Sequence, residues 1–465
     1  MAQCRRRTLL CVCFSFALLG NIFIYVTVSV CKAISESPVT IHIVPDRFIA
    51  PGLDNSSAVA SHPIKPFWDL HPDGGAFWNK LQISWDRKSN PILRETMALS
   101  EDAEESVLSP AGTDCNWVQS LKLRPPKFGT WPEQIQEFVL SMHCREYPLL
   151  LGQPETCGSE GEEAPMLLMA IKSQEGNFEN RQAIRQTWGR DGWVKGLKGK
   201  GGMVRRVFLL GKQDASAGPF ADVSDLLALE KGLYRDIVQW DFQDTFFNLT
   251  LKDVLFWHWF SHRCPRARFV FKGDDDVFVR TPVLLDALGQ EEQNPGSARK
   301  MSDFIVGDVI KNAVPLREAR NKYYIPENFY HGLYPAYAGG GGVVYSGALA
   351  LRLKQVSRSM HLFPIDDVYL GMCLQRLGVK PIHHPGFLTF DFPKGENKPC
   401  AYYSILLVHK RTPKEILKLW WELKVPHPVC VNNVTGFHDD SVNRVSVTRP
   451  LAPRNIWPNV HPFSL

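Results

Sequence analysis

Four short apolar runs, each of strand length and bounded by glycine or polar residues, most constrain the fold of this chain. They are MLLMAIKS (166–173), RRVFLLG (205–211), DIVQWDF (236–242) and RFVFKGDDD (268–276). Helix-like stretches separate them, among them 180–188 and 250–262. Strands that alternate with helices indicate a mostly parallel, twisted sheet with helices on both faces. The pattern predicts an α/β domain that binds its ligands outside the carboxyl ends of the strands.

The N-terminus predicts a membrane anchor. Residues 9–30 form an uncharged run of 22 residues, which is roughly 33 Å of helix and long enough to cross a bilayer. Arg5, Arg6 and Arg7 precede the run and favour a cytosolic N-terminus. A cleavable signal peptide is the alternative, although its apolar core is usually shorter. We expect a single-pass signal anchor with the rest of the chain in a secretory lumen.

The remaining sequence divides into four predicted parts. These are a cytosolic tail (1–8), a luminal stem (31–110), a catalytic domain (111–430) and an irregular C-terminal tail (431–465). The stem is rich in Pro, Ser and Asp and has little periodicity, as is typical of a spacer without a packed core. Its aromatic clusters indicate that parts of it dock on another surface; they are Phe67, Trp68, Phe77, Trp78 and Trp85.

Composition excludes several classes of protein. Hydrophobic residues make up 44% of the 465 residues and charged residues 22%, which excludes a wholly disordered or multi-span membrane protein. The formal net charge is only +5. Nucleic-acid binding would need a clustered basic face, and no such cluster follows the three N-terminal arginines.

The cysteines agree with a secretory location. Of 11 cysteines, seven lie beyond the anchor region, and they form no CxxC pair, which argues against a structural zinc site. In an oxidising lumen most would form disulfides, and an odd number leaves one free. We predict a Cys373–Cys400 pair, because these residues flank one 26-residue stretch. The sequons at Asn55, Asn248 and Asn433 are candidate glycosylation sites.

The segment FVFKGDDDVFV carries the strongest chemical signal, because an apolar strand ends directly in Asp274, Asp275 and Asp276. Three adjacent like charges are unfavourable unless a cation or water stabilises them. Asp274 and Asp276 can point the same way from an extended backbone and so offer two oxygen ligands to Mg²⁺ or Mn²⁺ beside a nucleotide phosphate. The alternatives are an acidic turn or a calcium loop, and the latter needs more oxygen ligands at wider spacing.

A second constellation lies near residues 334–377. Asp366 and Asp367 precede a helix-like stretch at 368–377, where a helix cap or first-turn charge is the alternative to a catalytic role. Four consecutive glycines, 339–342, allow close backbone approach to a ligand. Tyrosines on their N-terminal side, Tyr334 and Tyr337, offer flat faces that suit sugar rings.

Three basic residues complete the candidate set. Arg181 and Arg185 share a helix face and either grip a diphosphate or form surface ion pairs. His409 ends the apolar run SILLVH, where it is either an edge-of-core residue or a ligand for Mn²⁺.

Together RQAIRQTWG, FVFKGDDDVFV, YAGGGGVVYSG and PIDDVYLGMCLQRLG resemble the β1,3-glycosyltransferase family of galactosyl- and N-acetylglucosaminyltransferases, over about residues 110–430. The segments DTFFNLTLK, VGDVI, KYYIP and LLVHKRTP are similar to the branch that extends N-acetyllactosamine into polylactosamine. An insert around 189–203 and the tail after Cys430 depart from that branch. The resemblance implies a GT-A-like nucleotide-sugar-binding fold in the Golgi lumen.

The resemblance also implies a role for each candidate residue. Asp276 and His409 would ligate Mn²⁺, with Mg²⁺ as the alternative ion, and Asp274 would join them and face the donor. Asp367 would be the catalytic base. Other donor-side positions are Arg181, Arg185, Lys272 and Asp275. The acceptor-side positions are Asp366, Tyr324, Gly340 and Gly341.

The implied reaction moves N-acetylglucosamine from UDP-N-acetylglucosamine to a terminal galactose in β1,3 linkage, with inversion. A β1,3-galactosyltransferase that uses UDP-galactose is the alternative enzyme, and a lectin-like pseudoenzyme is the alternative of another class. The pseudoenzyme is expected to lack Asp276 or Asp367, and both are present. Acceptors would be galactose-terminated glycans on glycoproteins or glycolipids. The implied assembly is a homodimer or a hetero-oligomer with related transferases.

Overall fold

The computed structural model describes residues 48–49, 59–60, 75–89, 127–153, 156–158, 161–213, 223–293, 301–392, 400–425 and 430. All of them belong to one compact unit, Arg47–Leu465. The predicted cytosolic tail, membrane anchor and C-terminal tail lie outside these ranges. Within the ranges, no helix combines the length and the apolar character that crossing a membrane requires.

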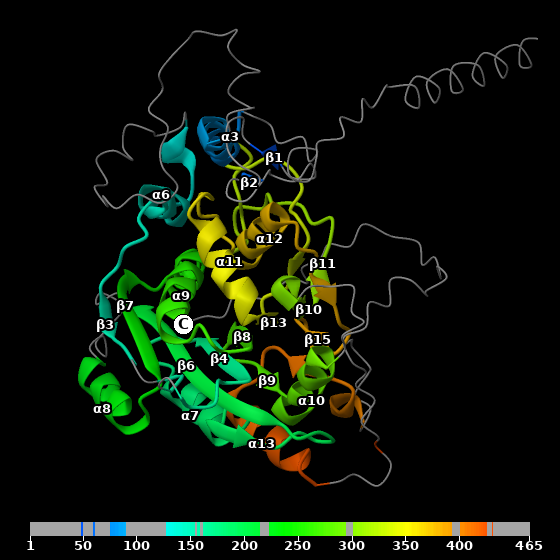
Figure 1. Cartoon of the computed structure of the whole chain (residues 1–465). Coiled ribbons are helices and arrows are strands. Elements are labelled where there is room, and N and C mark those ends of the chain that lie inside the picture. The colour runs from blue at the N-terminus through cyan, green and yellow to red at the C-terminus, as the bar shows by residue number, and fades with distance from the viewer. Residues whose placement is uncertain are drawn as a thin grey trace, which may run out of the picture. The chain divides into compact units, whose positions relative to one another are not determined.

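A nine-stranded sheet forms the centre of this unit (Figure 1). Its strands follow the order β14-β10-β13-β8-β4-β6-β7-β3, with β5 paired to β6. Their bounds are β3 Leu149–Leu151, β4 Leu167–Lys172, β5 Gly192–Val194, β6 Gly202–Lys212, β7 Ile237–Gln243, β8 Phe269–Asp274, β10 Ile305–Gly307, β13 Gly342–Ser346 and β14 Ile382–His383. Strands β8, β4, β6 and β7 are mutually parallel, whereas β13 and β3 flank them in the antiparallel direction. The expected α/β sheet is therefore parallel at its centre and mixed at its edges.

Side chains of the central strands alternate between two hydrophobic layers. On β4, Leu168 and Ala170 belong to the layer with α9 and α11, whereas Met169 and Ile171 belong to the layer with α7 and α10. A strand buried on both faces needs a continuous apolar run, which is why residues 166–171 of this strand are all apolar. The helices of the first layer are α6 Glu133–Ser141, α9 Leu249–Arg263, α11 Gly347–Ser357 and α12 Asp366–Leu377; those of the second are α7 Phe178–Gln186, α10 Thr281–Glu292 and α13 Pro413–Glu422.

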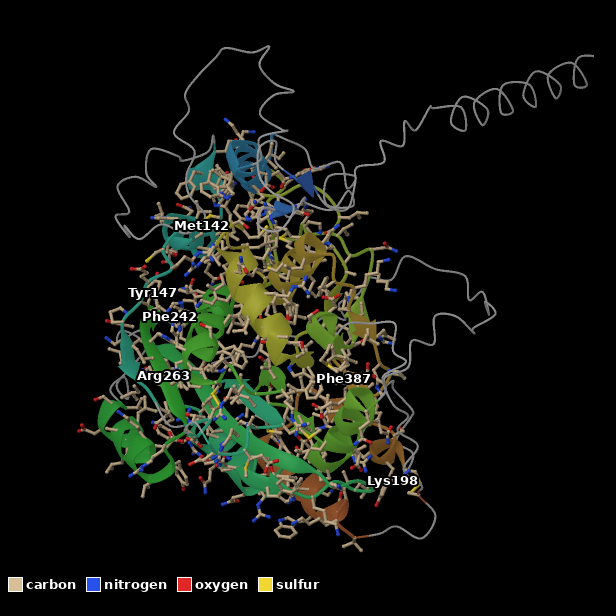
Figure 2. The ribbon with its side chains drawn as sticks, in the orientation of Figure 1. Met142, Tyr147, Lys198, Phe242, Arg263 and Phe387 are labelled. Atoms are coloured by element: carbon tan, nitrogen blue, oxygen red, sulfur yellow. A yellow bond between two sulfur atoms is a disulfide. The ribbon has the colours of Figure 1, made fainter. Side chains whose placement is uncertain are left out.

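Several short elements complete the fold. Strands β9 (Phe278–Val279), β16 (Leu407–Val408) and β15 (Phe387–Leu388) form a separate three-stranded sheet, and β11 (Val309–Ile310) pairs with β12 (Tyr337–Ala338). Helix α8 spans Ser224–Tyr234, short 3₁₀ turns lie at Phe128–Thr130, Met301–Asp303 and Ala401–Tyr403, and β1 (Phe48–Ile49) pairs with β2 (Val59–Ala60). At the sheet edge, the rings of Tyr147 and Phe242 meet edge to face with their centroids 5.9 Å apart. Figure 2 labels both residues.

Part of the predicted stem packs into the catalytic region. Helix α3 (Phe77–Ser89) contains Trp78, whose indole NH donates to Leu362 O at 2.8 Å. The Trp78 ring packs edge to face on Phe363, and Asp86 forms a buried ion pair with Arg376 of α12. The docking that the stem aromatics predicted is therefore present for this helix.

The disulfides correct one prediction. Cys157 bonds Cys264, and Cys400 bonds Cys430. Cys373 is a free thiol with no exposed surface, so the predicted Cys373–Cys400 pair is wrong. The reason is packing: Cys373 lies on the buried side of α12 within the hydrophobic core, whereas Cys400 lies beside Cys430. Cys144 is also disulfide-bonded.

Candidate functional site

The register of the central strands gathers the candidate residues at one edge. The parallel strands β4 and β8 end together, with Lys172 opposite Asp274. Strand β13 runs the other way and begins there, with Gly342 opposite Gly273. Because β13 is antiparallel, the glycine run before it reaches the carboxyl ends of its neighbours. Segments about 170 residues apart in sequence therefore meet at the edge where α/β sheets bind ligands.

Asp274, Asp276 and His409 form a cluster whose ligand atoms lie within 4.8 Å of one another. Strand β16 pairs with β9 just after Asp276, and this pairing brings His409 to the carboxylates. His409 Nε2 lies 3.2 Å from Asp276 Oδ1 and 3.8 Å from Asp274 Oδ2. Two carboxylates and one imidazole are a ligand set that suits Mn²⁺, and an oxygen-rich set also accepts Mg²⁺.

The hydrogen bond on the far side of the His409 ring leaves the other ring nitrogen facing the carboxylates. His409 Nδ1 lies 3.0 Å from Thr389 O, a carbonyl that only accepts, so Nδ1 carries the proton. In the neutral ring, the Nε2 lone pair then faces two carboxylates, and a cation or a second proton must compensate. Burial works to lower the pKa of His409, but Asp276 and Asp274 outweigh it and raise that pKa. The residues therefore fit a divalent ion.

The glycine run lies between the metal cluster and the second acidic pair. A Cβ on Gly340 would lie 2.7 Å from Asp367 Oδ2, and a Cβ on Gly341 would lie 3.0 Å from His409 Cβ. Any larger residue would displace one of these side chains. The two glycines thus permit Asp367 and His409 to approach the same short backbone segment. Close approach of a ligand to this segment remains a prediction.

Buried lysines connect the two acidic groups. Lys172 Nζ lies 2.5 Å from Asp366 Oδ2 and 3.2 Å from Asp274 Oδ1. Lys272 Nζ lies 2.5 Å from Asp253 Oδ2 and 3.7 Å from Asp366 Oδ2. The motifs in the sequence did not indicate Lys172 or Asp253 as site residues. The only sequence signal is the position of each charged residue. Lys172 ends an apolar run, and Asp253 lies inside a largely apolar helix.

Asp366 and Asp367 have different environments although they are neighbours. Burial works to raise the pKa of Asp366, but Lys172 and Lys272 lower it to about 2. Burial and the charge of Asp366 hold the pKa of Asp367 well above the usual range of a carboxyl. Asp366 therefore stays ionised and ion-paired, whereas Asp367 is the stronger base. A carboxylate with a raised pKa beside other charged groups is a typical general base.

Three predicted donor-side residues have internal partners. Asp275 is buried and accepts hydrogen bonds from Ser173 Oγ at 2.6 Å and Asn177 Nδ2 at 2.9 Å, and burial raises its pKa to about 6. Arg181 pairs with Glu230 at 2.6 Å. Arg185 pairs with Glu230 at 2.5 Å and Asp236 at 2.8 Å. Both guanidinium groups are buried, so the structure favours the ion-pair interpretation over an open diphosphate grip, although the pairs are internal rather than at the surface.

The tyrosines before the glycine run do not offer the open faces that the sequence indicated. Tyr334 and Tyr337 are 5% and 6% exposed, so they belong to the core and offer no open face to a sugar. Tyr324 is half-buried. Its neighbour Tyr323 packs edge to face on Phe246 at 5.1 Å. Burial first, and then the charges of Asp367 and Asp366, raise the pKa of Tyr323. Burial and the charge of Asp367 likewise raise the pKa of Tyr337.

Of the three sequons, only that of Asn248 lies within the described residues. Asn248 is the N-cap residue of α9 and is half-buried, and its side-chain amide donates to Gln243 O at 2.8 Å. The sequon threonine, Thr250, is buried and donates to Phe363 O. Glycosylation of Asn248 remains a prediction. Asn55 and Asn433 lie outside the described residues.

These features together define a class of protein. Central parallel strands end beside the Asp274–Asp276–His409 cluster, whose side chains could hold a metal ion, and a carboxylate of raised pKa lies next to that cluster. Such an arrangement is typical of an α/β transferase that holds a nucleotide-linked donor at the strand ends and activates a second substrate with a base.

Comparisons with known proteins are more specific. The Galactosyltransferase family model matches residues 179–385. The chain is 41% identical to mouse N-acetyllactosaminide beta-1,3-N-acetylglucosaminyltransferase 2 over 92% of its own length and 100% of the relative. It is 41% identical to the human protein of that name, with 89% and 96% covered. It is 44% identical to bovine UDP-GlcNAc:betaGal beta-1,3-N-acetylglucosaminyltransferase 9, with 66% and 78% covered.

This chain therefore belongs to the β1,3-glycosyltransferase family, as its motifs indicated. A solved bacterial structure, 4-diphosphocytidyl-2C-methyl-D-erythritolsynthase from Anaerococcus prevotii, covers 56% of this chain and 99% of its own, at 10% identity and a TM-score of 0.28. That likeness is too weak to carry an argument. The central parallel sheet by itself is consistent with the expected GT-A-like fold.

Proposed function

We propose that this protein transfers N-acetylglucosamine from UDP-N-acetylglucosamine to the 3-hydroxyl of a terminal galactose on N-acetyllactosamine-type glycans, with inversion, and so extends polylactosamine. The observation that carries the proposal is Asp367, a carboxylate of raised pKa beside the Asp274–Asp276–His409 cluster. The relatives whose names state this β1,3-N-acetylglucosaminyl transfer support the same donor and acceptor.

Asp274, Asp276 and His409 would hold a Mn²⁺ ion, with Mg²⁺ as the alternative. When bound, the ion supplies Lewis-acid stabilisation of the charge that develops on the UDP leaving group. Thr389 O fixes the His409 tautomer, so that Nε2 faces the carboxylates. Lys172 neutralises part of the charge on Asp274 and on Asp366 at the same time. If Asp275, Lys272, Arg181 or Arg185 contributes to donor binding, it would do so through the buried residues with which it pairs.

Asp367 takes the proton from the acceptor hydroxyl as the hydroxyl oxygen attacks the anomeric carbon of the donor sugar and the bond from that carbon to UDP breaks. Direct inversion needs one base and no covalent nucleophile, by the same logic as inverting glycosidases. Lys172 and Lys272 stabilise the ionised form of Asp366, which makes it a poor base. We therefore assign Asp366 to acceptor binding rather than to proton transfer. Tyr324, Gly340 and Gly341 remain proposed acceptor positions, and Gly340 makes room for Asp367.

A donor and acceptor panel with the purified full chain tests this function. UDP-N-acetylglucosamine and UDP-galactose are each offered with a galactose-terminated and an N-acetylglucosamine-terminated oligosaccharide. We expect transfer only from UDP-N-acetylglucosamine to the galactose terminus, and a β1,3 linkage by NMR. Asp367→Asn is the inactive control. Efficient transfer from UDP-galactose would replace the proposal by the galactosyltransferase alternative. Absence of all transfer would favour the lectin-like pseudoenzyme.

We also propose that the protein is a single-pass type II protein of the Golgi membrane with residues 31–465 in the lumen. The uncharged run at 9–30 and the arginines before it support this topology. Protease protection of sealed Golgi vesicles tests it. Only the N-terminal tail should be cleaved without detergent.

Association of the protein with itself or with related transferases is part of the same proposal, and crosslinking in those vesicles tests it.

A further inference from the structure

We propose that Arg411 is a positioning residue for the metal site, because it fixes the turn that presents His409 to Asp274 and Asp276. The inference rests on the proposed metal-dependent function and adds a residue to it. Arg411 follows β16 and is only 5% exposed, although an arginine at a strand end usually reaches solvent.

Arg411 connects the two chain segments that supply the metal ligands. Its backbone NH donates to Asp276 O at 2.7 Å. Its Nη1 donates to His409 O at 3.1 Å and to Lys410 O at 2.9 Å. One residue therefore holds the main chain on both sides of the cluster, although Asp276 and His409 are far apart in sequence.

The turn that Arg411 holds is unfavourable by itself. Lys410 has φ 59°, in the left-handed region that residues with a Cβ rarely adopt. Such strain persists where the surroundings over-determine it, and it often marks a functional site. Here two successive carbonyls, those of His409 and Lys410, point at one guanidinium nitrogen. The hydrogen bonds compensate for the strained conformation.

The far end of the guanidinium is anchored as well. Nη2 donates to Asp391 Oδ1 at 2.5 Å and to Tyr402 Oη at 3.2 Å. Asp391 follows Thr389, whose carbonyl orients the His409 ring, and His409 NH donates to Leu388 O at 3.0 Å. Arg411 thus links the strand that orients the imidazole to the turn that carries it. A lysine has no planar fork and cannot bind all of these acceptors at once.

The experiment measures Mn²⁺ binding to the full chain by electron paramagnetic resonance of free Mn²⁺, without substrate. Arg411→Lys should weaken Mn²⁺ affinity by about 10-fold or more, because residues that orient metal ligands typically contribute 10- to 100-fold. Arg352→Lys is the matched control. Arg352 also pairs with a carboxylate, Asp303, and donates to the Ser302 carbonyl, but it lies on α11 and has no contact with the cluster. The Arg352→Lys variant should bind Mn²⁺ with the same affinity as the wild type.

A double-mutant cycle separates the proposed role from general destabilisation. Glycine adopts the left-handed turn without penalty, so in a Lys410→Gly background Arg411→Lys should cause a smaller loss of affinity. Equal losses in both backgrounds, or an Arg411→Lys variant that binds Mn²⁺ like the wild type, would overturn the inference. Asp391→Asn provides a milder variant in case Arg411→Lys does not fold, and it should reduce affinity in the same direction.

Asp276→Asn distinguishes failure of the inference from failure of the function. If Asp276→Asn loses Mn²⁺ binding and Arg411→Lys does not, only the positioning role is wrong. If the wild type binds no Mn²⁺, or Asp276→Asn binds it as well as the wild type, the metal-dependent function fails and the positioning role fails with it.

Discussion

Two neighbouring carboxylates acquire different chemistry from their surroundings at the scale of single residues. Asp366 lies against Lys172 and Lys272, whereas Asp367 lies beside Gly340 and next to the charge of Asp366. The lysines lower one pKa to about 2, and burial with like charge raises the other. When the surroundings shift the pKa values of two adjacent acids in opposite directions, one of them can serve as a general base.

Substitution of the two acids should separate these roles. Asp367→Asn keeps size and hydrogen bonding but cannot accept a proton, so turnover should fall at least about 10²-fold. Donor binding with Mn²⁺ should stay near normal in a titration. Asp366→Asn should instead raise the acceptor KM and lower thermal stability, because it leaves Lys172 and Lys272 with less compensation. If Asp367→Asn turned over normally while Asp366→Asn was inactive, the two roles would have to be exchanged.

The pH dependence follows from the direction of the Asp367 shift. The carboxyl must be ionised to act as a base, so activity falls as pH falls through its pKa. That pKa is raised above the ordinary 3.8, so the acidic limb of kcat/KM for the acceptor should lie at a higher pH than an ordinary aspartate gives. Lys172 works to lower the same pKa, so Lys172→Gln should move the limb to still higher pH. A limb at or below the ordinary value would contradict this assignment.

Metal removal tests the carboxylate–imidazole cluster. EDTA should abolish transfer, and Mn²⁺ should restore it, because Asp274, Asp276 and His409 present three converging ligand atoms. Asp276→Asn should lower turnover far more than it lowers the unfolding temperature, because Asp276 is partly exposed. Full activity in a metal-free preparation would rule out the metal role.

Helix α3 matters most at the scale of secondary-structure elements. It belongs by sequence to the stem, yet it contacts the chain just before Asp366. Trp78 binds Leu362 O and packs on Phe363, and Gln82 Oε1 accepts from the His361 NH. The segment that leads into α12 is thus packed on one side by a helix almost 300 residues earlier.

Loss of the Trp78 contacts should destabilise the catalytic region. Trp78→Ala removes a fully buried ring and should cost about 3–5 kcal/mol of unfolding free energy. Trp78→Phe keeps much of the packing and loses one hydrogen bond, so it should cost less, about 1–2 kcal/mol. Trp193, which is 56% exposed, is the control, and Trp193→Ala should stay within about 0.5 kcal/mol. Urea unfolding measures all three, and equal effects at both positions would show that α3 does not pack as described.

The disulfides act at the scale of the whole molecule. Cys157–Cys264 closes a separation of 107 residues and Cys400–Cys430 one of 30. Cys157 precedes β4 and Cys264 follows α9, so the first bond connects the central sheet to one of its helix layers.

Loss of the longer disulfide should be the more damaging. In the chain-entropy model, removing Cys157–Cys264 by paired serine substitution should cost about 4.8 kcal/mol, against about 3.6 kcal/mol for Cys400–Cys430. Urea unfolding of each variant measures the difference. Cys373 should react with a thiol reagent only after unfolding, because it is buried. Its reaction in the native state, or its recovery in a disulfide-linked peptide, would contradict the structure.

Local pattern alone determined much of this protein. The four apolar runs predicted strands β4, β6, β7 and β8, and two helix-like stretches correspond to α7 and α9. The continuous apolar runs sufficed because parallel strands are buried on both faces. The acidic strand end, the glycine run and the motifs that identify the family are likewise contiguous in sequence, and the family is confirmed by 41% identity over 92% of the chain.

Only the tertiary structure decided which side chains meet. The partners of Cys400 and Asp366, Cys430 and Lys172, depend on how distant segments pack, and no spacing along the chain encodes that distance. Burial likewise assigned Tyr334 and Tyr337 to the core, although their chemistry also suits a sugar-binding surface. The different pKa values of Asp366 and Asp367 also exist only in the folded state, because buried lysines and neighbouring charge produce them.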